Sequence, residues 1–138
     1  MTPYLDTSAM IRACRMDVAP RGVTRTHTLA EFYSTLTGVG VLTVIGGREV
    51  KERLSPKAAA KEIRRTFAHV KFYDMGPDLV MEALERAAKK NVHGRNIHDW
   101  LHCLAAEKSK CDVIVTLNFS DFSLMTDLPL VNPRKQFA

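Results

Sequence analysis

The chain has 138 residues, of which 46% are hydrophobic and 25% are charged, and its formal net charge is +5. This composition is typical of one globular domain spanning residues 1–138, without linkers or repeats, and the positive charge favours a polyanionic partner such as nucleic acid. Three cysteines without a CxxC pair argue against a disulfide framework. The early charge at Asp6 excludes a signal-peptide core, and no apolar run approaches the ~20 residues of a membrane helix. We therefore expect a cytoplasmic protein.

The first predicted element is a short strand at residues 3–5, which ends abruptly in Asp6, Thr7 and Ser8. A helix follows in AMIRACRM, residues 9–16, where apolar residues recur at helical spacing. The carboxyl ends of parallel strands form the ligand-binding edge of a sheet, so Asp6 is a candidate site residue, with Thr7 and Ser8 as caps and hydrogen-bond donors. Read alone, Asp6 also suits a helix cap with no further role.

A polar connection at residues 17–25 precedes a second predicted helix in THTLAEFYSTLTG, whose stop is Gly38. Glu31 lies away from the middle of the apolar stripe of this helix, which would direct it toward a cleft, although a glutamate on a helix is usually solvated. The run at residues 39–50 contains IGGR between two apolar segments. It predicts a hairpin or an extended flap.

The middle of the chain continues the alternation of helices and strands. Ser55 and Pro56 predict the cap and first turn of a helix that runs through residue 67, and residues 70–73 predict a strand. Pro77 opens another helix, through about residue 90, and LPLVNP near the end predicts a short final strand before a frayed tail. This order predicts an α/β fold with a mostly parallel sheet.

The stretch NIHDWLHCLAAEKSKCDVIVTLNFSDF, residues 96–122, reads as a helix, a strand and an acidic loop. Asn96 is the expected cap, and Asp99 falls in the first turn, where the helix dipole favours a negative charge. The β-branched run at residues 113–115 predicts a strand covered on both faces. The polar residues that follow it lie where α/β proteins bind ligands, and they are Thr116, Asn118 and Asp121.

Four carboxylates on four different elements form the main candidate site: Asp6, Glu31, Asp99 and Asp121. Gathered carboxylates repel one another, and a divalent cation is the usual way to neutralise them. Mg²⁺ or Mn²⁺ is the natural choice, because both prefer oxygen ligands and accept phosphate oxygens as well. The predicted chemistry is hydrolysis of a phosphodiester by a metal-activated water, in an acidic hole surrounded by a basic surface.

A second constellation is HDWLH, in which His98 and His102 stand at i and i+4 around Asp99. Two histidines at this spacing can bind one zinc ion, so a zinc hydrolase is an alternative. Aspartate is shorter than the glutamate of the HExxH motif, however, and no downstream residue offers a convincing third ligand. The simpler interpretation is that His98 is a helix-start histidine and that His102 packs at its neighbour's side. Cys103 is expected to be a small buried hydrophobic residue.

Four segments in order, YLDTSAMI, AEFYSTLTG, IHDWLHCLAAEKSKCDVIVTLNFSDF and LPLVNP, resemble a PIN-domain protein, specifically a VapC-type toxin, over nearly the whole chain. The resemblance implies an α/β/α sandwich and a metal-dependent endoribonuclease, with Asp6, Glu31 and Asp99 at the family's acidic positions and Asp6 and Asp99 as principal metal ligands. The hydroxyls of Thr7, Ser8 and Thr116 resemble the family's supporting donors.

One position departs from the family pattern: Asn118 stands where members often have Asp, and the acid follows at Asp121. The segment 39–53 matches no motif of the family. The resemblance further implies a homodimer and a cognate VapB-like antitoxin that covers the active site. A PIN-like module that binds RNA or a partner without cutting is the alternative from another class, and the presence of all four acids argues against it.

Overall fold

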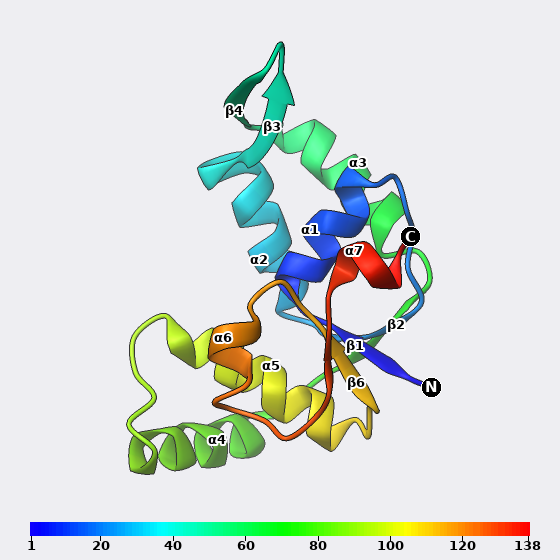
Figure 1. The fold of residues 1–138 in the computed structure, drawn as a ribbon. Coiled ribbons are helices and arrows are strands. Elements are labelled where there is room, and N and C mark those ends of the chain that lie inside the picture. The colour runs from blue at the N-terminus through cyan, green and yellow to red at the C-terminus, as the bar shows by residue number, and fades with distance from the viewer.

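A five-stranded parallel sheet forms the centre of the protein, in a computed structural model that describes residues 1–138 (Figure 1). Its strands, in spatial order, are β5 (Val70–Tyr73), β2 (Gly22–Arg25), β1 (Pro3–Leu5), β6 (Val113–Val115) and β7 (Leu130–Val131). Every neighbouring pair is parallel. The predicted parallel sheet is thereby confirmed.

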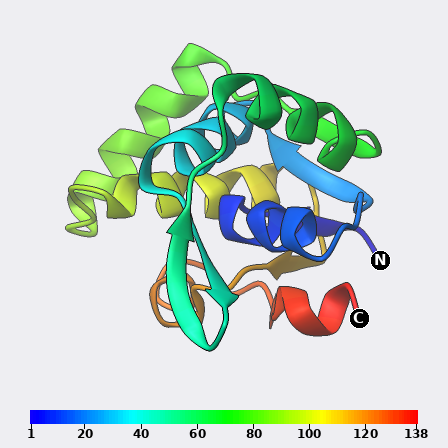
Figure 2. The ribbon, with the colours of Figure 1, turned by 90° about the horizontal axis from the view of Figure 1, so that it is seen from above.

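Helices cover both faces of the sheet because successive residues of its central strands point in opposite directions. Leu5 and Val115 pack with α1 (Thr7–Arg15), α2 (Thr28–Ser34) and α3 (Pro56–Thr66). Tyr4 and Ile114 pack instead with α5 (Asn96–Lys108) and α6 (Phe119–Phe122), and α4 (Pro77–Lys89) packs on α5. Figure 2 shows the arrangement of these helices from above.

This arrangement confirms the α/β/α sandwich. The helices predicted from Pro56 and Pro77 begin at those residues, and Ser55 caps the first of them by accepting a hydrogen bond from the Ala58 N–H. The buried strand at residues 113–115 and the strand at residues 70–73 are confirmed as well. None of the helices combines the length and the apolar character needed to cross a bilayer.

Several boundaries differ from the sequence prediction. The supposed connection at residues 17–25 contains β2, a strand too short and mixed in composition to show a period of its own. The second helix does not stop at Gly38 but continues as the π-helix η1 (Thr35–Val39), and Gly40 ends it with a φ of 84°. The tail is not frayed, because it forms the short helix α7 (Pro133–Gln136).

The start of α5 and the segment after β6 also differ. Arg95, and not Asn96, is the residue before the first helical turn, and no side chain caps it. The acidic loop expected after β6 contains the one-turn helix α6. Asp99 nevertheless lies in the first turn of α5, as predicted.

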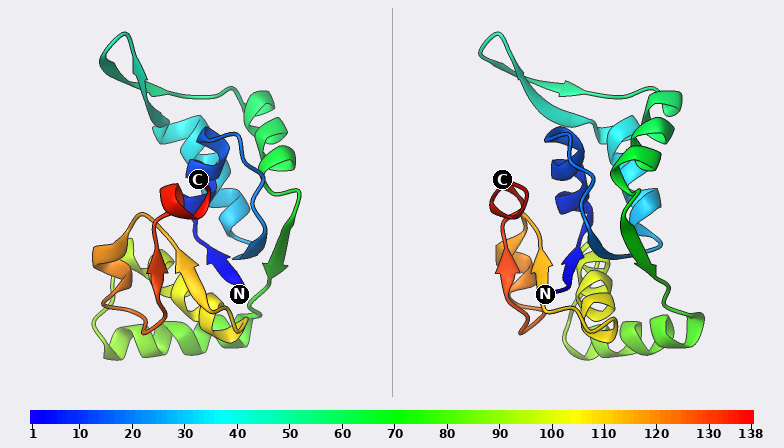
Figure 3. Two further views of the ribbon diagram at one scale, coloured as in Figure 1. Left: turned by 45° about the vertical axis from the view of Figure 1, so that its right-hand side comes forward. Right: turned by 90° about the vertical axis from the view of Figure 1, so that its right-hand side faces the viewer.

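Residues 41–52 form an antiparallel hairpin, which settles the choice between hairpin and flap. It consists of β3 (Val41–Ile45) and β4 (Arg48–Glu52), a two-stranded sheet separate from the central one. Gly46 and Gly47 have φ values of 58° and 79°, as the mirror-image turn of a two-residue hairpin requires. The hairpin reaches out beyond the helices in both views of Figure 3.

We expect Gly40→Ala to destabilise the protein by about 1–3 kcal/mol, the typical cost of a strained backbone conformation. A Cβ at residue 40 would lie 2.8 Å from the backbone oxygen of Glu52, at a φ that side chains rarely adopt. Gly38→Ala is the matched control, because nothing lies within 4 Å of its Cβ position, and it should be neutral or stabilising. Urea denaturation measures both, and equal stabilities would contradict the prediction.

Candidate functional site

The site lies at the carboxyl ends of β1 and β6, the two central strands. Leu5 pairs with Val115, so the next residue of each strand, Asp6 and Thr116, emerges at the same edge. The backbone reinforces this neighbourhood, since the Asp6 N–H donates to the Val115 carbonyl at 3.3 Å. The register of two strands therefore brings together residues that are 110 positions apart in the sequence.

Asp6 is almost fully buried, with 3% of its surface exposed, and both of its carboxylate oxygens are held. Oδ1 accepts from the Ala9 N–H at 2.8 Å, as an N-cap of α1 does, and from the Ser8 hydroxyl at 2.7 Å. Oδ2 accepts from the Thr116 hydroxyl at 2.6 Å. Burial raises the pKa of Asp6 even though these hydrogen bonds favour the charged form.

Asp99 and Asp121 share one donor. The side-chain amide of Asn118 donates to Asp99 Oδ2 at 2.8 Å and to Asp121 Oδ2 at 3.0 Å. The pKa of Asp99 is raised, first by burial and then by the negative charges of Asp6 and Asp121. An amide at residue 118 therefore bridges two acids, where an aspartate would add a further negative charge.

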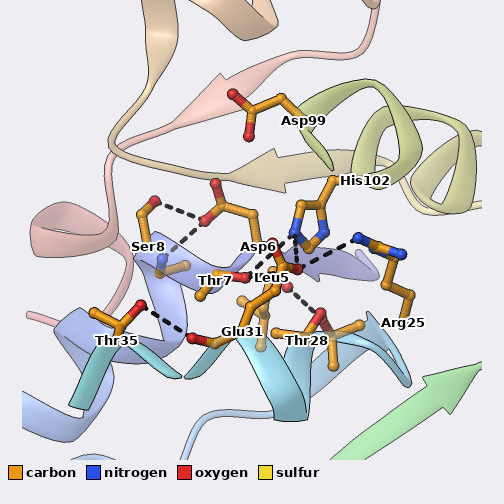
Figure 4. A network of polar contacts seen from close by, with 12 residues as sticks. Leu5, Asp6, Thr7, Ser8, Arg25, Thr28, Glu31, Thr35, Asp99 and His102 are labelled. Atoms are coloured by element: carbon orange, nitrogen blue, oxygen red, sulfur yellow. Dashed lines mark hydrogen bonds and ion pairs between the residues drawn. The ribbon is translucent and has the colours of Figure 1, made fainter. Parts of the chain in front are cut away.

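Glu31 belongs to a different network, shown in Figure 4. Its Oε1 accepts from the Thr7 hydroxyl at 3.2 Å and lies 3.1 Å from Nε2 of His102 and 3.4 Å from Nη2 of Arg25. Burial alone would favour a neutral Glu31, but His102 and Arg25 outweigh it and lower its pKa to about 2. This glutamate is thus balanced by cationic and hydrogen-bonding groups of the protein itself.

Two residues of the Glu31 network carry no obvious signal in the sequence, and they are Arg25 and Tyr4. Arg25 is buried at the end of β2, the strand that the periodicity did not reveal. Recognising that strand would have placed Arg25 at the same sheet edge as Asp6. The Tyr4 hydroxyl lies 2.7 Å from Nδ1 of His102, and burial raises the tyrosine pKa, so this hydroxyl stays protonated and donates.

The Tyr4 contact assigns the tautomer of His102. Because Nδ1 accepts from Tyr4, the proton of the neutral ring lies on Nε2, where it donates to Glu31. Both ring nitrogens are therefore in use, and neither is free to bind zinc. His98 takes no part in this network and stacks on His27, with ring centroids 6.1 Å apart. The geometry thus gives no support to the HDxxH zinc centre, and His102 is instead a buried member of the Glu31 network.

No three His, Cys, Asp or Glu side chains form a group that could hold a metal ion. Glu31 shares no hydrogen-bond partner with Asp6, Asp99 or Asp121. No Lys or Arg forms an ion pair with Asp6 or Asp99. A pair of carboxylates still fits Mg²⁺, which proteins commonly hold with one or two carboxylates while water and phosphate oxygens fill the other positions. The repulsion between Asp6 and Asp99 is what such a cation would relieve.

An open hollow of about 420 Å³ lies beside Glu31. Its lining is mostly polar and consists of His27, Ala30, Glu31, Ser34, Thr35 and His98. The hollow gives a polar ligand room to approach the Glu31 network from solvent.

No protein-family model matches the chain, and no curated protein sequence matches it significantly. Among solved structures, the fold is similar to that of VapC20 from Mycobacterium tuberculosis, described as a toxin that cleaves the sarcin-ricin loop. The TM-score is 0.59, the sequence identity is 15%, and the match covers 89% of this chain and 95% of the other. The PIN-like fold expected from the sequence is confirmed by this likeness, at the level of the fold.

Proposed function

We propose that the protein is a Mg²⁺- or Mn²⁺-dependent endoribonuclease of the VapC type, a toxin acting on RNA. The observation that carries the proposal is the pair Asp6 and Asp99, two desolvated carboxylates at the carboxyl edge of a parallel sheet. Both have raised pKa values, and no basic side chain is paired with either. The likeness of fold to a toxin that cleaves RNA supports the same function.

In this proposal Asp6 and Asp99 hold the cation. When bound, the ion supplies a water of lowered pKa and stabilises charge on the phosphodiester. Thr116 and Ser8 orient the Asp6 carboxylate, and Asn118 orients Asp99. Glu31 and Asp121 flank this pair, and the net charge of +5 attracts the polyanionic substrate.

The test is cleavage of labelled RNA by the purified protein with Mg²⁺, with Mn²⁺, with Zn²⁺ or with a chelator. We expect cutting with Mg²⁺ or Mn²⁺ alone, because hard cations suit a pair of carboxylates. Binding of RNA without cutting under every condition would favour the non-catalytic module. Cutting that depends on Zn²⁺ would favour the zinc hydrolase.

The proposal includes an antitoxin of the VapB kind that restrains the enzyme, since an unrestrained ribonuclease would harm its own cell. Its support is the family resemblance of the sequence. If it is correct, expression of this chain alone should arrest growth of a host, and co-expression of a small neighbouring gene should relieve the arrest. Growth unaffected by this chain alone would contradict the toxin part of the proposal.

A further inference from the structure

The outer strand of the hairpin, β4, carries charged side chains that have no partner within the protein. All five residues of β4, Arg48-Glu49-Val50-Lys51-Glu52, are exposed, and none of the four charged side chains forms an ion pair. Their partners across the hairpin carry no charge and are Ile45, Val44, Leu42 and Val41. No other strand pairs with β4 on its far side.

The charges of β4 are complementary to those of a second β4 that runs antiparallel to it. If a second β4 runs antiparallel with Val50 opposite Val50, Arg48 lies opposite Glu52 and Glu49 lies opposite Lys51. The twofold axis repeats both pairs, so every charge on both strands has a partner of opposite sign. Opposite charges directly across an antiparallel pair stabilise it, and like charges destabilise it.

Other registers of the two β4 strands place like charges opposite each other. A parallel pairing places Arg48 opposite Arg48, and a shift by one residue brings either Arg48 opposite Lys51 or Glu49 opposite Glu52. A shift by two residues places Glu49 or Lys51 opposite itself. The register centred on Val50 is therefore the one in which all the charges attract.

The backbone of β4 is free to make this pairing. Residues that flank a two-residue turn exchange both backbone hydrogen bonds, and the pairs then alternate along the ladder. From the closing pair Ile45 and Arg48, it follows that Glu49 and Lys51 direct their N–H and C=O groups away from β3. They are also the residues that face each other in the register centred on Val50, so donors meet acceptors.

We propose that β4 pairs antiparallel with β4 of a second copy of this chain, centred on Val50, which forms a four-stranded sheet across a twofold axis. An isolated two-stranded hairpin is marginal in water, and two more strands would give it the support that it lacks. An edge strand usually avoids a second copy with charges of like sign or proline, whereas β4 carries balanced charges that invite one. The hairpin lies at the far end of the molecule from α5 and α6 (Figure 1), and the proposal does not rest on the nuclease function.

Two single charge reversals test the pairing. In a homodimer, Glu49→Lys places the new lysine opposite Lys51, and Lys51→Glu places the new glutamate opposite Glu49, so each variant should self-associate about tenfold or more weakly than wild type. Mixed in equal amounts, the two variants should associate with each other, because lysines of one chain then face glutamates of the other. Analytical ultracentrifugation of each variant, of the mixture and of wild type at several concentrations measures this.

The matched controls are Glu85→Lys and Lys61→Glu, which make the same charge changes at exposed helix positions outside the hairpin, and they should associate as wild type does. A monomeric wild type at all concentrations would overturn the proposal. So would single variants that self-associate normally, which would place any dimer interface elsewhere, or a mixture that stays monomeric. None of these outcomes depends on RNA cleavage, so a failure here is distinguishable from a failure of the proposed function.

A cysteine at the twofold axis gives an independent readout. In the proposed register the two Val50 residues form a non-hydrogen-bonded pair with Cα atoms about 4.5 Å apart, within the range that a disulfide spans. Val50→Cys should therefore give a covalent dimer under mild oxidation, whereas Leu42→Cys, which lies on β3 and is also exposed, should not. Equal cross-linking of both variants would overturn the register.

Discussion

The Asp99→Asn variant should fold normally and cut RNA about 100-fold or more slowly than wild type, because it removes one of the two carboxylates proposed to hold the cation. An asparagine at residue 99 keeps a side-chain oxygen that can accept from Asn118, so the loop after β6 should stay in place. Asp127→Asn is the matched control, since it neutralises an exposed carboxylate away from the site. A folded Asp99→Asn protein that cuts at the wild-type rate would rule out the proposed mechanism.

The same variant has a second readout, which does not depend on activity. In the absence of metal, ionised Asp99 destabilises the folded protein, because burial and the charge of Asp6 raise its pKa above the ordinary 3.8. This cost is absent below that value and appears as the pH rises through the raised pKa. Metal-free Asp99→Asn should therefore be more stable than wild type at pH 7, and the difference should shrink as the pH falls toward 3.8.

With Mg²⁺ added, wild type should become more stable than Asp99→Asn. A cation that binds the folded wild type stabilises it by mass action, whereas the variant lacks part of the site and should gain little. Thermal unfolding of both proteins with a chelator and with excess Mg²⁺ measures the effect. If the two proteins respond equally to Mg²⁺, the ion binds elsewhere.

His102→Ala should destabilise the protein by about 2–4 kcal/mol, the combined cost of a buried cavity and of polar groups left without partners. The change removes the acceptor of the Tyr4 hydroxyl and a donor to Glu31. His93→Ala, at an exposed position, is the control and should have little effect. Tyr4→Phe should make the His102→Ala change less costly, because it removes the hydroxyl that would otherwise lose its acceptor.

The stability of the folded protein should depend on pH through the ionisation of Glu31. Its pKa of about 2 in the folded state is below the ordinary 4.5, so the network contributes stability above pH 4.5 that is lost as the pH falls toward 2. The difference in stability between wild type and His102→Ala should therefore become smaller as the pH falls from 4.5 toward 2. The variant should also keep its dependence on Mg²⁺, and neither protein should contain stoichiometric zinc. Zinc present in wild type and lost from His102→Ala would restore the zinc alternative.

Elements with strong local signals could be predicted from the amino-acid sequence. The run of β-branched residues at 113–115 marked a buried strand, and Pro56 and Pro77 marked helix starts, because these signals lie within a few neighbouring residues. The alternation of helices and strands implied a parallel sheet, and the position of Asp6 after the first strand placed it at the ligand-binding edge.

The hydrogen-bond partners of the four acids could not be predicted from the sequence, because they come from distant segments. The register of β1 against β6 brings Thr116 onto Asp6, and the missed strand β2 delivers Arg25 to Glu31, so that this glutamate is balanced from within. Such contacts join residues from 6 to 110 positions apart, through a strand order that no local pattern contains. The sequence can name acidic residues on separate elements, but the distances between their side chains arise only when the sheet brings those elements together.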